Sequence, residues 1–146
     1  MNRAKRLAPV QDVVEAAERR LAQSLADLQR RVAEAESKLL ELERYRGEYQ
    51  HGFTQRAGGG IGVAQLRDYQ AFLSRLSEAI RQQQSVLQRT CSDRDAEQQR
   101  WQQAARRVKA VDHVVDQWQA EERRATEQRE QRETDDRGQH SRRRDL

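Results

Sequence analysis

Apolar residues recur every seven positions over the first part of the chain. One row consists of Leu7, Val14, Leu21, Leu28, Ala35, Leu42 and Tyr49. A second row consists of Val10, Ala17, Leu25, Val32, Leu39 and Phe53. Sustained heptads of this kind predict a coiled-coil helix. Proline suits the first turn of a helix, where its missing N–H has no intrahelical partner, so we predict a helix over 9–53 that begins at Pro9.

The helical pattern stops at a run of glycines. Four of the five positions from Gly58 to Gly62 are glycine. Each glycine disfavours a helix by about 1 kcal/mol relative to alanine. The sequence therefore predicts a turn over 54–62.

A second set of heptads follows this turn. Its first row consists of Leu66, Leu73, Ile80, Leu87, Arg94, Trp101, Val108 and Val115. Its second row consists of Tyr69, Leu76, Gln83, Thr90, Glu97, Ala104, Val111 and Trp118. The middle of this seam, from Gln83 to Glu97, is polar, which lowers stability but helps to fix the register of a coiled coil. We predict a helix over 63–136, because helix-favouring residues continue after the apolar rows end at Trp118, and a disordered tail over 137–146.

The two predicted helices differ in length. At about 1.5 Å per residue, the helix over 9–53 is about 65–70 Å long and the helix over 63–136 is about 110 Å long. A chain that folds back near residues 59–60 pairs residues whose numbers sum to about 119. Trp118 then lies near the start of the chain, and residues 119–136 form an overhang with no intramolecular partner. A lone polar helix of this length is marginal in water, so it frays or is held by another protein.

The predicted fold class is all-α, an antiparallel two-helix coiled-coil hairpin with an overhanging C-terminal helix, which makes residues 1–136 a single hairpin. The alternative is a bundle in which the helices pair between chains. The composition agrees with either arrangement. Charged residues make up 36% and aromatic residues 5% of the chain. The few large apolar residues that remain can fill a narrow seam between two helices but not a wide core.

The charge is well mixed, although the chain has a net charge of +4. Basic and acidic residues number 11 and 9 over residues 1–60, 9 and 7 over 61–119, and 8 and 8 over 120–146. Nucleic-acid binders concentrate basic charge on one face, so a solvated surface is favoured and no nucleic-acid partner is expected. No apolar run approaches the roughly 20 residues that cross a bilayer, and no apolar stretch of a signal peptide follows the basic N-terminus. We therefore expect a cytoplasmic protein.

Residues that could carry catalysis do not form a recognisable site. The three histidines, His51, His113 and His140, are far apart and lack ligands at metal spacing. Cys91 is a lone thiol and is expected to be an inert helix residue. The glycine run lacks the Gly-Lys-Ser/Thr ending of a phosphate-binding loop. We expect no enzyme activity, no metal and no cofactor.

The aromatic residues are concentrated around the predicted turn. All three tyrosines and both phenylalanines lie between residues 45 and 72: Tyr45, Tyr49, Phe53, Tyr69 and Phe72. In the hairpin, the first two lie opposite residues near 74 and 70, so the five rings are expected to be neighbours. They either close this end of the seam or form an interface, because exposed aromatic clusters are good interface anchors.

Several short segments, in this order around a glycine turn, resemble the FliJ family, the small coiled-coil component of the bacterial flagellar type III export apparatus. These segments are 6–10, 42–49, 69–73, 76–80 with Gln83, 100–101 and 129–136. The resemblance implies a coiled coil similar to the central stalk of rotary ATPases. It also implies a protein that binds the hexameric export ATPase, the export gate protein FlhA and export chaperones. It places the protein at the cytoplasmic face of the inner membrane, at the flagellar base, held there only through its partners.

The resemblance also implies which residues make these contacts. The positions matching the FlhA-binding patch are Leu42, Tyr45, Tyr49, Phe72, Leu76, Ala79 and Gln83. Those expected to contact the ATPase ring are Leu7, Pro9, Trp118, Arg129, Glu130, Gln131, Asp135 and Asp136. Lys38 departs from the family pattern, which has an uncharged polar residue there. The alternatives are a structural coiled-coil spacer and a stalk protein of a related secretion system.

Overall fold

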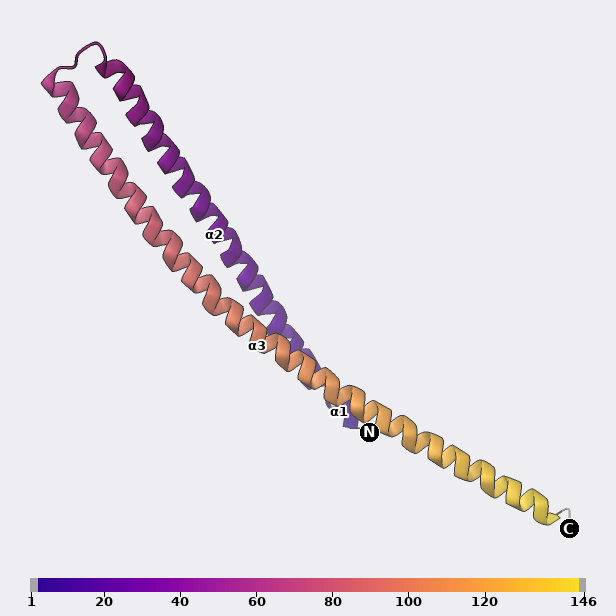
Figure 1. The fold of residues 1–146 in the computed structure, drawn as a ribbon. Helices are drawn as coiled ribbons and strands as arrows, with labels where there is room; N and C mark the ends of the chain where they lie inside the picture. Colours follow the sequence, from indigo (N-terminus) through magenta and orange to yellow (C-terminus); the bar gives the residue numbers. More distant parts are fainter. Residues whose placement is uncertain (1–2, 145–146) are drawn as a thin grey trace. The chain divides into compact units, whose positions relative to one another are not determined.

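The computed structural model describes residues 3–144, and every regular element in this part of the chain is helical. A single turn of helix, α1 (Arg3–Arg6), precedes the long helices α2 (Ala8–Ala57) and α3 (Val63–Arg144). The glycine turn joins the end of α2 to the start of α3 (Figure 1). The predicted all-α class, with two long helices that form an antiparallel coiled-coil hairpin, is confirmed.

The turn is shorter than the sequence predicts, because α2 continues to Ala57 instead of ending at residue 53. Its last turns are supported by local bonds from side chains to the backbone. The Thr54 hydroxyl donates to the Gln50 carbonyl at 2.9 Å, and Arg56 Nε donates to the Gly52 carbonyl at 3.3 Å. After Ala57, Gly60 takes a positive φ of 92°, which a residue with a Cβ adopts only with strain.

The start of α2 is close to the prediction, and Pro9 lies in its first turn. The sequence did not predict α1. Its single turn is linked to α2 by two backbone bonds, in which the Leu7 amide donates to Ala4 at 3.2 Å and the Gln11 amide donates to Leu7 at 2.8 Å.

Contacts divide the chain into two compact units. The turn unit is Leu21–Trp101, and the terminal unit combines the chain up to Arg20 with the chain from Gln102 onward. Within each unit, a segment of α2 packs antiparallel to a segment of α3. In the turn unit, Ser24 bonds to Glu97, and in the terminal unit Gln11 bonds to Asp112. Both pairs have residue numbers that sum close to the predicted value, so the chain folds back near its glycines as expected.

The core of each unit is a narrow seam. In the turn unit, the buried residues are Leu25, Val32, Ala35, Leu76, Ile80 and Gln83. In the terminal unit, they are Ala4, Ala104 and Val115. All of them except Ala4 belong to the heptad rows, which confirms that the rows face inward. Val10 and Leu66 are the exceptions among the row residues, with 43% and 42% of their surface exposed, because they lie at the two ends of the rows.

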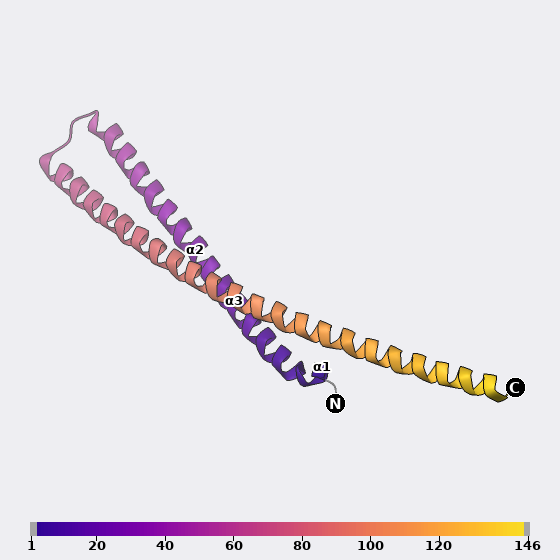
Figure 2. The same ribbon diagram turned by 60° about the horizontal axis from the view of Figure 1, so that its bottom comes forward.

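The last part of α3 is unpaired within the terminal unit. Every residue from 123 to 144 is exposed, and we call this segment the overhang. In both views it extends beyond α1 with no other described segment beside it (Figures 1 and 2). The sequence predicts a disordered tail over 137–146, but the helix continues to Arg144. Arginine and glutamine favour helix, and they continue past residue 136; residues 145–146 lie outside the described part of the chain.

Replacing Ile80 with alanine is expected to lower the free energy of unfolding by about 2–5 kcal/mol, since only 2% of Ile80 is exposed. Urea unfolding followed by circular dichroism measures this loss. Leu40→Ala is the matched control, because Leu40 is 65% exposed and should cost no more than about 0.5 kcal/mol. Equal losses at the two positions would contradict the observed seam.

Two glycines on either side of the α2 terminus should respond oppositely to alanine. A Cβ on Gly47 meets nothing within 4 Å, so Gly47→Ala should stabilise the chain by about 0.5–1 kcal/mol. Gly60 is equally open but has a positive φ, so Gly60→Ala should destabilise it by about 1–2 kcal/mol. Urea midpoints that move in the same direction for both variants would contradict the observed turn.

Candidate functional site: two interaction surfaces

Five rings form a cluster in the turn unit, and we call them the aromatic patch: Tyr45, Tyr49, Phe53, Tyr69 and Phe72. Phe53 and Tyr69 stack with their centroids 3.5 Å apart and their planes at 9°. Tyr49 lies 5.4 Å from Tyr69 and 4.5 Å from Phe72, measured between ring centroids. Tyr45 meets the edge of Phe72 at 6.1 Å. The prediction that rings on the two helices are neighbours is confirmed.

The patch closes the seam and also offers a surface. Phe53, Tyr69, Tyr49 and Phe72 are partly buried against one another, so most of their area contributes to packing of the hairpin. Tyr45 is different, because half of its surface is exposed while its ring rests on Phe72. An aromatic ring held in place on one side and exposed on the other is well suited to anchor a partner.

The structure separates the residues of the expected FlhA patch into two groups. Tyr45, Tyr49 and Phe72 come together, with Leu42 and Ala79 partly exposed on the same two helices. Leu76 and Gln83 instead lie in the seam, with only 7% and 8% of their surface exposed. The Gln83 side chain is also engaged, because Nε2 donates to the Ala35 carbonyl at 3.1 Å. In this conformation these two residues offer little surface to another protein.

An open depression, which the sequence did not predict, lies beside the aromatic patch. The residues lining it are Tyr49, Phe53, Arg56, Gly60, Ile61, Gln65, Asp68 and Tyr69. Its lining combines the guanidinium of Arg56 and the carboxylate of Asp68 with three partly buried rings. A polar rim around an apolar centre is the usual arrangement of a protein interface.

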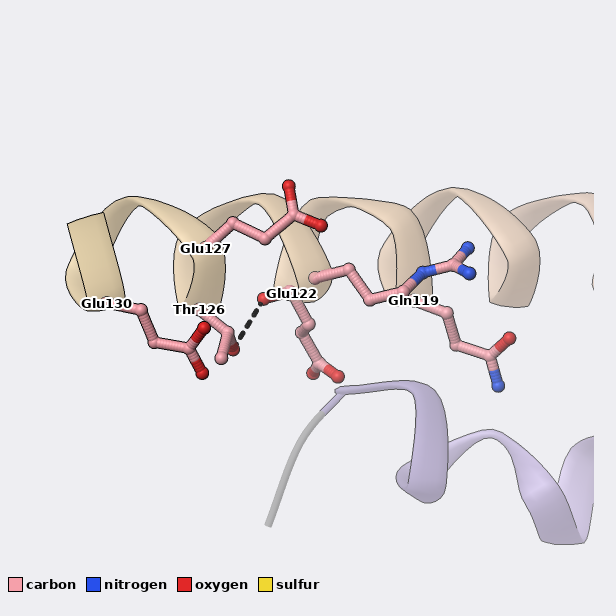
Figure 3. Close-up of a pocket in the computed structure, with 6 residues that line it drawn as sticks. Gln119, Glu122, Thr126, Glu127 and Glu130 are labelled. Carbon is pink, nitrogen blue, oxygen red and sulfur yellow. Dashed lines mark hydrogen bonds between the residues drawn. The ribbon is translucent and has the colours of Figure 1, made fainter.

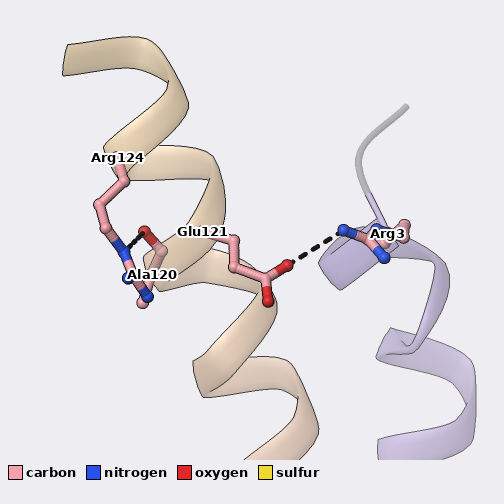
Figure 4. Close-up of polar contacts among 4 residues, drawn as sticks. All are labelled: Arg3, Ala120, Glu121 and Arg124. Carbon is pink, nitrogen blue, oxygen red and sulfur yellow. Dashed lines mark hydrogen bonds and ion pairs between the residues drawn. The ribbon is translucent and has the colours of Figure 1, made fainter. Parts of the chain in front are cut away.

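In the terminal unit, the beginning of the chain packs against α3. The Arg3 guanidinium lies 5.1 Å from the centroid of the Trp118 ring and forms an ion pair with Glu121 at 3.1 Å. Figure 4 shows this pair between α1 and α3. The predicted position of Trp118 near the start of the chain is confirmed. The ion pair is largely exposed, so it contributes little to stability and leaves both side chains accessible to a partner.

The expected ATPase-ring residues occupy two parts of the terminal unit. Leu7 and Trp118 are partly buried in the paired region, and Pro9 is exposed beside them. The others project from the overhang and are fully accessible: Arg129, Glu130, Gln131, Asp135 and Asp136. A shallow groove runs along the first part of the overhang and the residues just before it, and it is lined by Gln119, Glu122, Arg123, Thr126, Glu127 and Glu130 (Figure 3). The residues that line it are of polar and charged types, with both signs of charge.

The described residues, 3–144, contain no group of three or more histidine, cysteine, aspartate or glutamate side chains that could hold a metal ion. Cys91 is a partly buried free thiol. Across the same residues, no helix combines the length and apolar character needed to cross a membrane.

Comparison with known families decides what kind of protein carries these two surfaces. The family described as "Flagellar FliJ protein" matches residues 3–145. The chain belongs to the FliJ family. Both candidate surfaces of this FliJ-family protein lie within the matched region, and the family is a non-enzymatic component of flagellar export. Comparisons with curated proteins and with solved structures give no match.

Proposed function

We propose that this FliJ-family protein connects the flagellar export ATPase to the export gate protein FlhA and performs no chemistry itself. The observation that carries the proposal is the presence of two different surfaces in two different units. The turn unit has an exposed aromatic anchor, and the terminal unit has a charged, unpaired helix. Surfaces so different in chemistry suit two different partners.

The terminal unit is proposed to bind the ATPase hexamer. Exposed residues throughout the overhang leave that helix without tertiary contacts, and packing supplies most helical stability in proteins. A surrounding ring of subunits would provide the missing contacts. The mixed charges of the overhang, such as Arg129 beside Glu130 and Asp135, suit a polar ring interior with alternating charge.

The aromatic patch is proposed to bind FlhA, with Tyr45 as its anchor. A tyrosine combines a large apolar ring with a hydroxyl at low conformational cost, and such residues dominate binding energies. Leu42 and Ala79 extend the apolar surface, and Arg56 and Asp68 supply polar groups at its edge. Leu76 and Gln83 contribute from beneath this surface by holding the helices in place.

Binding to the ATPase and to FlhA would hold the protein at the cytoplasmic face of the inner membrane, at the flagellar base. Family membership also makes export chaperones candidate partners, which the protein would escort between export cycles. The well-mixed charge gives no support to a nucleic-acid partner.

Analytical ultracentrifugation with purified partners tests the proposal. The chain is mixed with the export ATPase from the same bacterium, with the cytoplasmic domain of FlhA, and with both together. We expect two binary complexes and one ternary complex, because the two surfaces do not overlap in sequence. A structural spacer would sediment alone in all three mixtures, and mutually exclusive binding of the two partners would contradict a link between them.

A further inference from the structure

The hairpin needs something other than its turn and its apolar rows to define which residues face one another. The connection between the helices is mostly glycine, so it tolerates many backbone conformations. The rows repeat every seven residues, so sliding one helix past the other by a heptad again places row against row. Neither feature selects a single register within the turn unit.

Gln83 has the properties of a residue that makes this selection. It is the one polar residue among the buried residues of the described chain, with 8% of its surface exposed. Its Nε2 donates to the Ala35 carbonyl at 3.1 Å. Ala35 is itself buried at 7% exposure, and its methyl side chain leaves room for the glutamine to reach the backbone of the facing helix.

The residues one heptad before and after Ala35 are larger. Leu28 and Leu42 occupy these positions in the same row. After a slide of one heptad, the Gln83 amide would face one of these leucines, whose side chain covers the helix backbone. A buried amide that loses its hydrogen-bond partner is strongly disfavoured. Polar residues at seam positions are known to fix register in coiled coils in this way.

We infer that Gln83 determines the register of the turn unit, through a hydrogen bond that forms only opposite Ala35. A second polar pair acts in the same direction, because the Ser24 hydroxyl donates to Glu97 at 2.9 Å across the same unit. Gln83 is thus a positioning residue. It determines which rings of α2 meet which rings of α3, and therefore how Tyr45 rests on Phe72.

The distance between two spin labels measures the register. The labels are attached at two exposed positions of the turn unit, through Ser37→Cys and Gln98→Cys in a Cys91→Ser background. The labels are offset along the seam, so a slide of one heptad changes their separation by up to about 10 Å. We expect one distance for the otherwise unchanged chain. Gln83→Leu should add a second population at a displaced distance while the melting temperature stays equal or rises, because leucine fills the seam without a polar penalty.

Two further variants complete the experiment. Ala35→Leu blocks access to the carbonyl and should produce the same second population. Gln82→Leu makes the identical chemical change at an exposed neighbouring glutamine and should leave a single distance. A single unchanged distance in Gln83→Leu and Ala35→Leu would overturn the inference.

The register is a property of the chain alone, so its test does not depend on the proposed function. Under that function, Gln83→Leu also weakens FlhA binding in proportion to the displaced population, since Tyr45 then loses its support on Phe72. A second distance with unchanged FlhA affinity would support the role of Gln83 in register and count against the aromatic patch as the FlhA site.

Discussion

A chain that ends at Trp118 is expected to lose all stimulation of the export ATPase and to bind the hexamer at least about tenfold more weakly, or ~1.4 kcal/mol. The deletion removes the overhang and the groove along its first part, and with them five of the eight proposed ring contacts: Arg129, Glu130, Gln131, Asp135 and Asp136. The paired part of the hairpin should still melt cooperatively, since every buried residue of the described chain lies before position 119. Steady-state ATP hydrolysis and thermal melts followed by circular dichroism provide the two measurements.

A shorter deletion is the control for this prediction. A chain that ends at Asp136 keeps every proposed contact and loses only residues 137–146. It should retain most of the ATPase stimulation, which separates the proposed contacts from the general effect of shortening α3. Full stimulation by the chain that ends at Trp118 would show that the overhang is not the ATPase-binding element.

Tyr45→Ala is expected to weaken binding to the cytoplasmic domain of FlhA by about 100-fold, or ~2.7 kcal/mol, which lies within the range of interface anchors. Half of the Tyr45 surface is exposed, so the substitution removes a surface that a partner can contact, together with the ring contact to Phe72. ATPase stimulation should stay unchanged, because Tyr45 lies in the turn unit and the proposed ring contacts lie in the terminal unit. Isothermal titration calorimetry with purified FlhA domain measures the affinity.

Leu40→Ala is the matched control, since it also shortens an exposed apolar side chain on α2. Leu40 is not among the five residues of the aromatic patch, and its replacement should leave FlhA affinity within about twofold, ~0.4 kcal/mol. If Tyr45→Ala reduced FlhA affinity and ATPase stimulation together, the two surfaces would not be independent. If it reduced neither, the patch would serve only to close the hairpin.

Much of the fold follows from periodicity. The heptad rows correctly predicted the buried face of both long helices, including Leu25 and Ile80, because a coiled-coil seam repeats at a fixed interval. The position of the glycines then predicted the antiparallel pairing that brings Trp118 to Arg3. These predictions succeed because seam and turn are local features that each leave a clear pattern in the sequence.

The helix ends were predicted less well, since they depend on interactions that leave weak patterns. α2 passes Gly52 and ends at Ala57 with the help of side-chain bonds from Thr54 and Arg56. The heptad rows, whose last residue is Phe53, suggested an earlier end. At the end of α3, residues that favour helix continue past residue 136, and the helix extends to Arg144. No apolar row reaches that far, so the heptad pattern could not predict where α3 ends.

The two lines of sequence reasoning disagreed on four residues: Leu42, Tyr49, Leu76 and Gln83. The heptad rows place all four in the seam, whereas the family resemblance places them in a binding surface. Leu76 and Gln83 are buried, in agreement with the rows, whereas Leu42 and Tyr49 are partly exposed. The bond from Gln83 to the Ala35 carbonyl could not be predicted, because it depends on the side-chain conformation and on the space that a small residue leaves across the seam.

All of these proposals require the two long helices of one molecule to pair with each other. Two double-cysteine variants test this pairing, one in each unit. The first replaces Gln11 and Asp112, whose side chains are 3.1 Å apart. The second replaces Ser24 and Glu97, whose side chains are 2.9 Å apart. A short bis-maleimide linker should join each pair in a Cys91→Ser background and give a cross-linked monomer whose yield does not change with protein concentration. Cross-linked dimers that increase with concentration, with no cross-linked monomer, would show that the helices pair between chains and would contradict the hairpin.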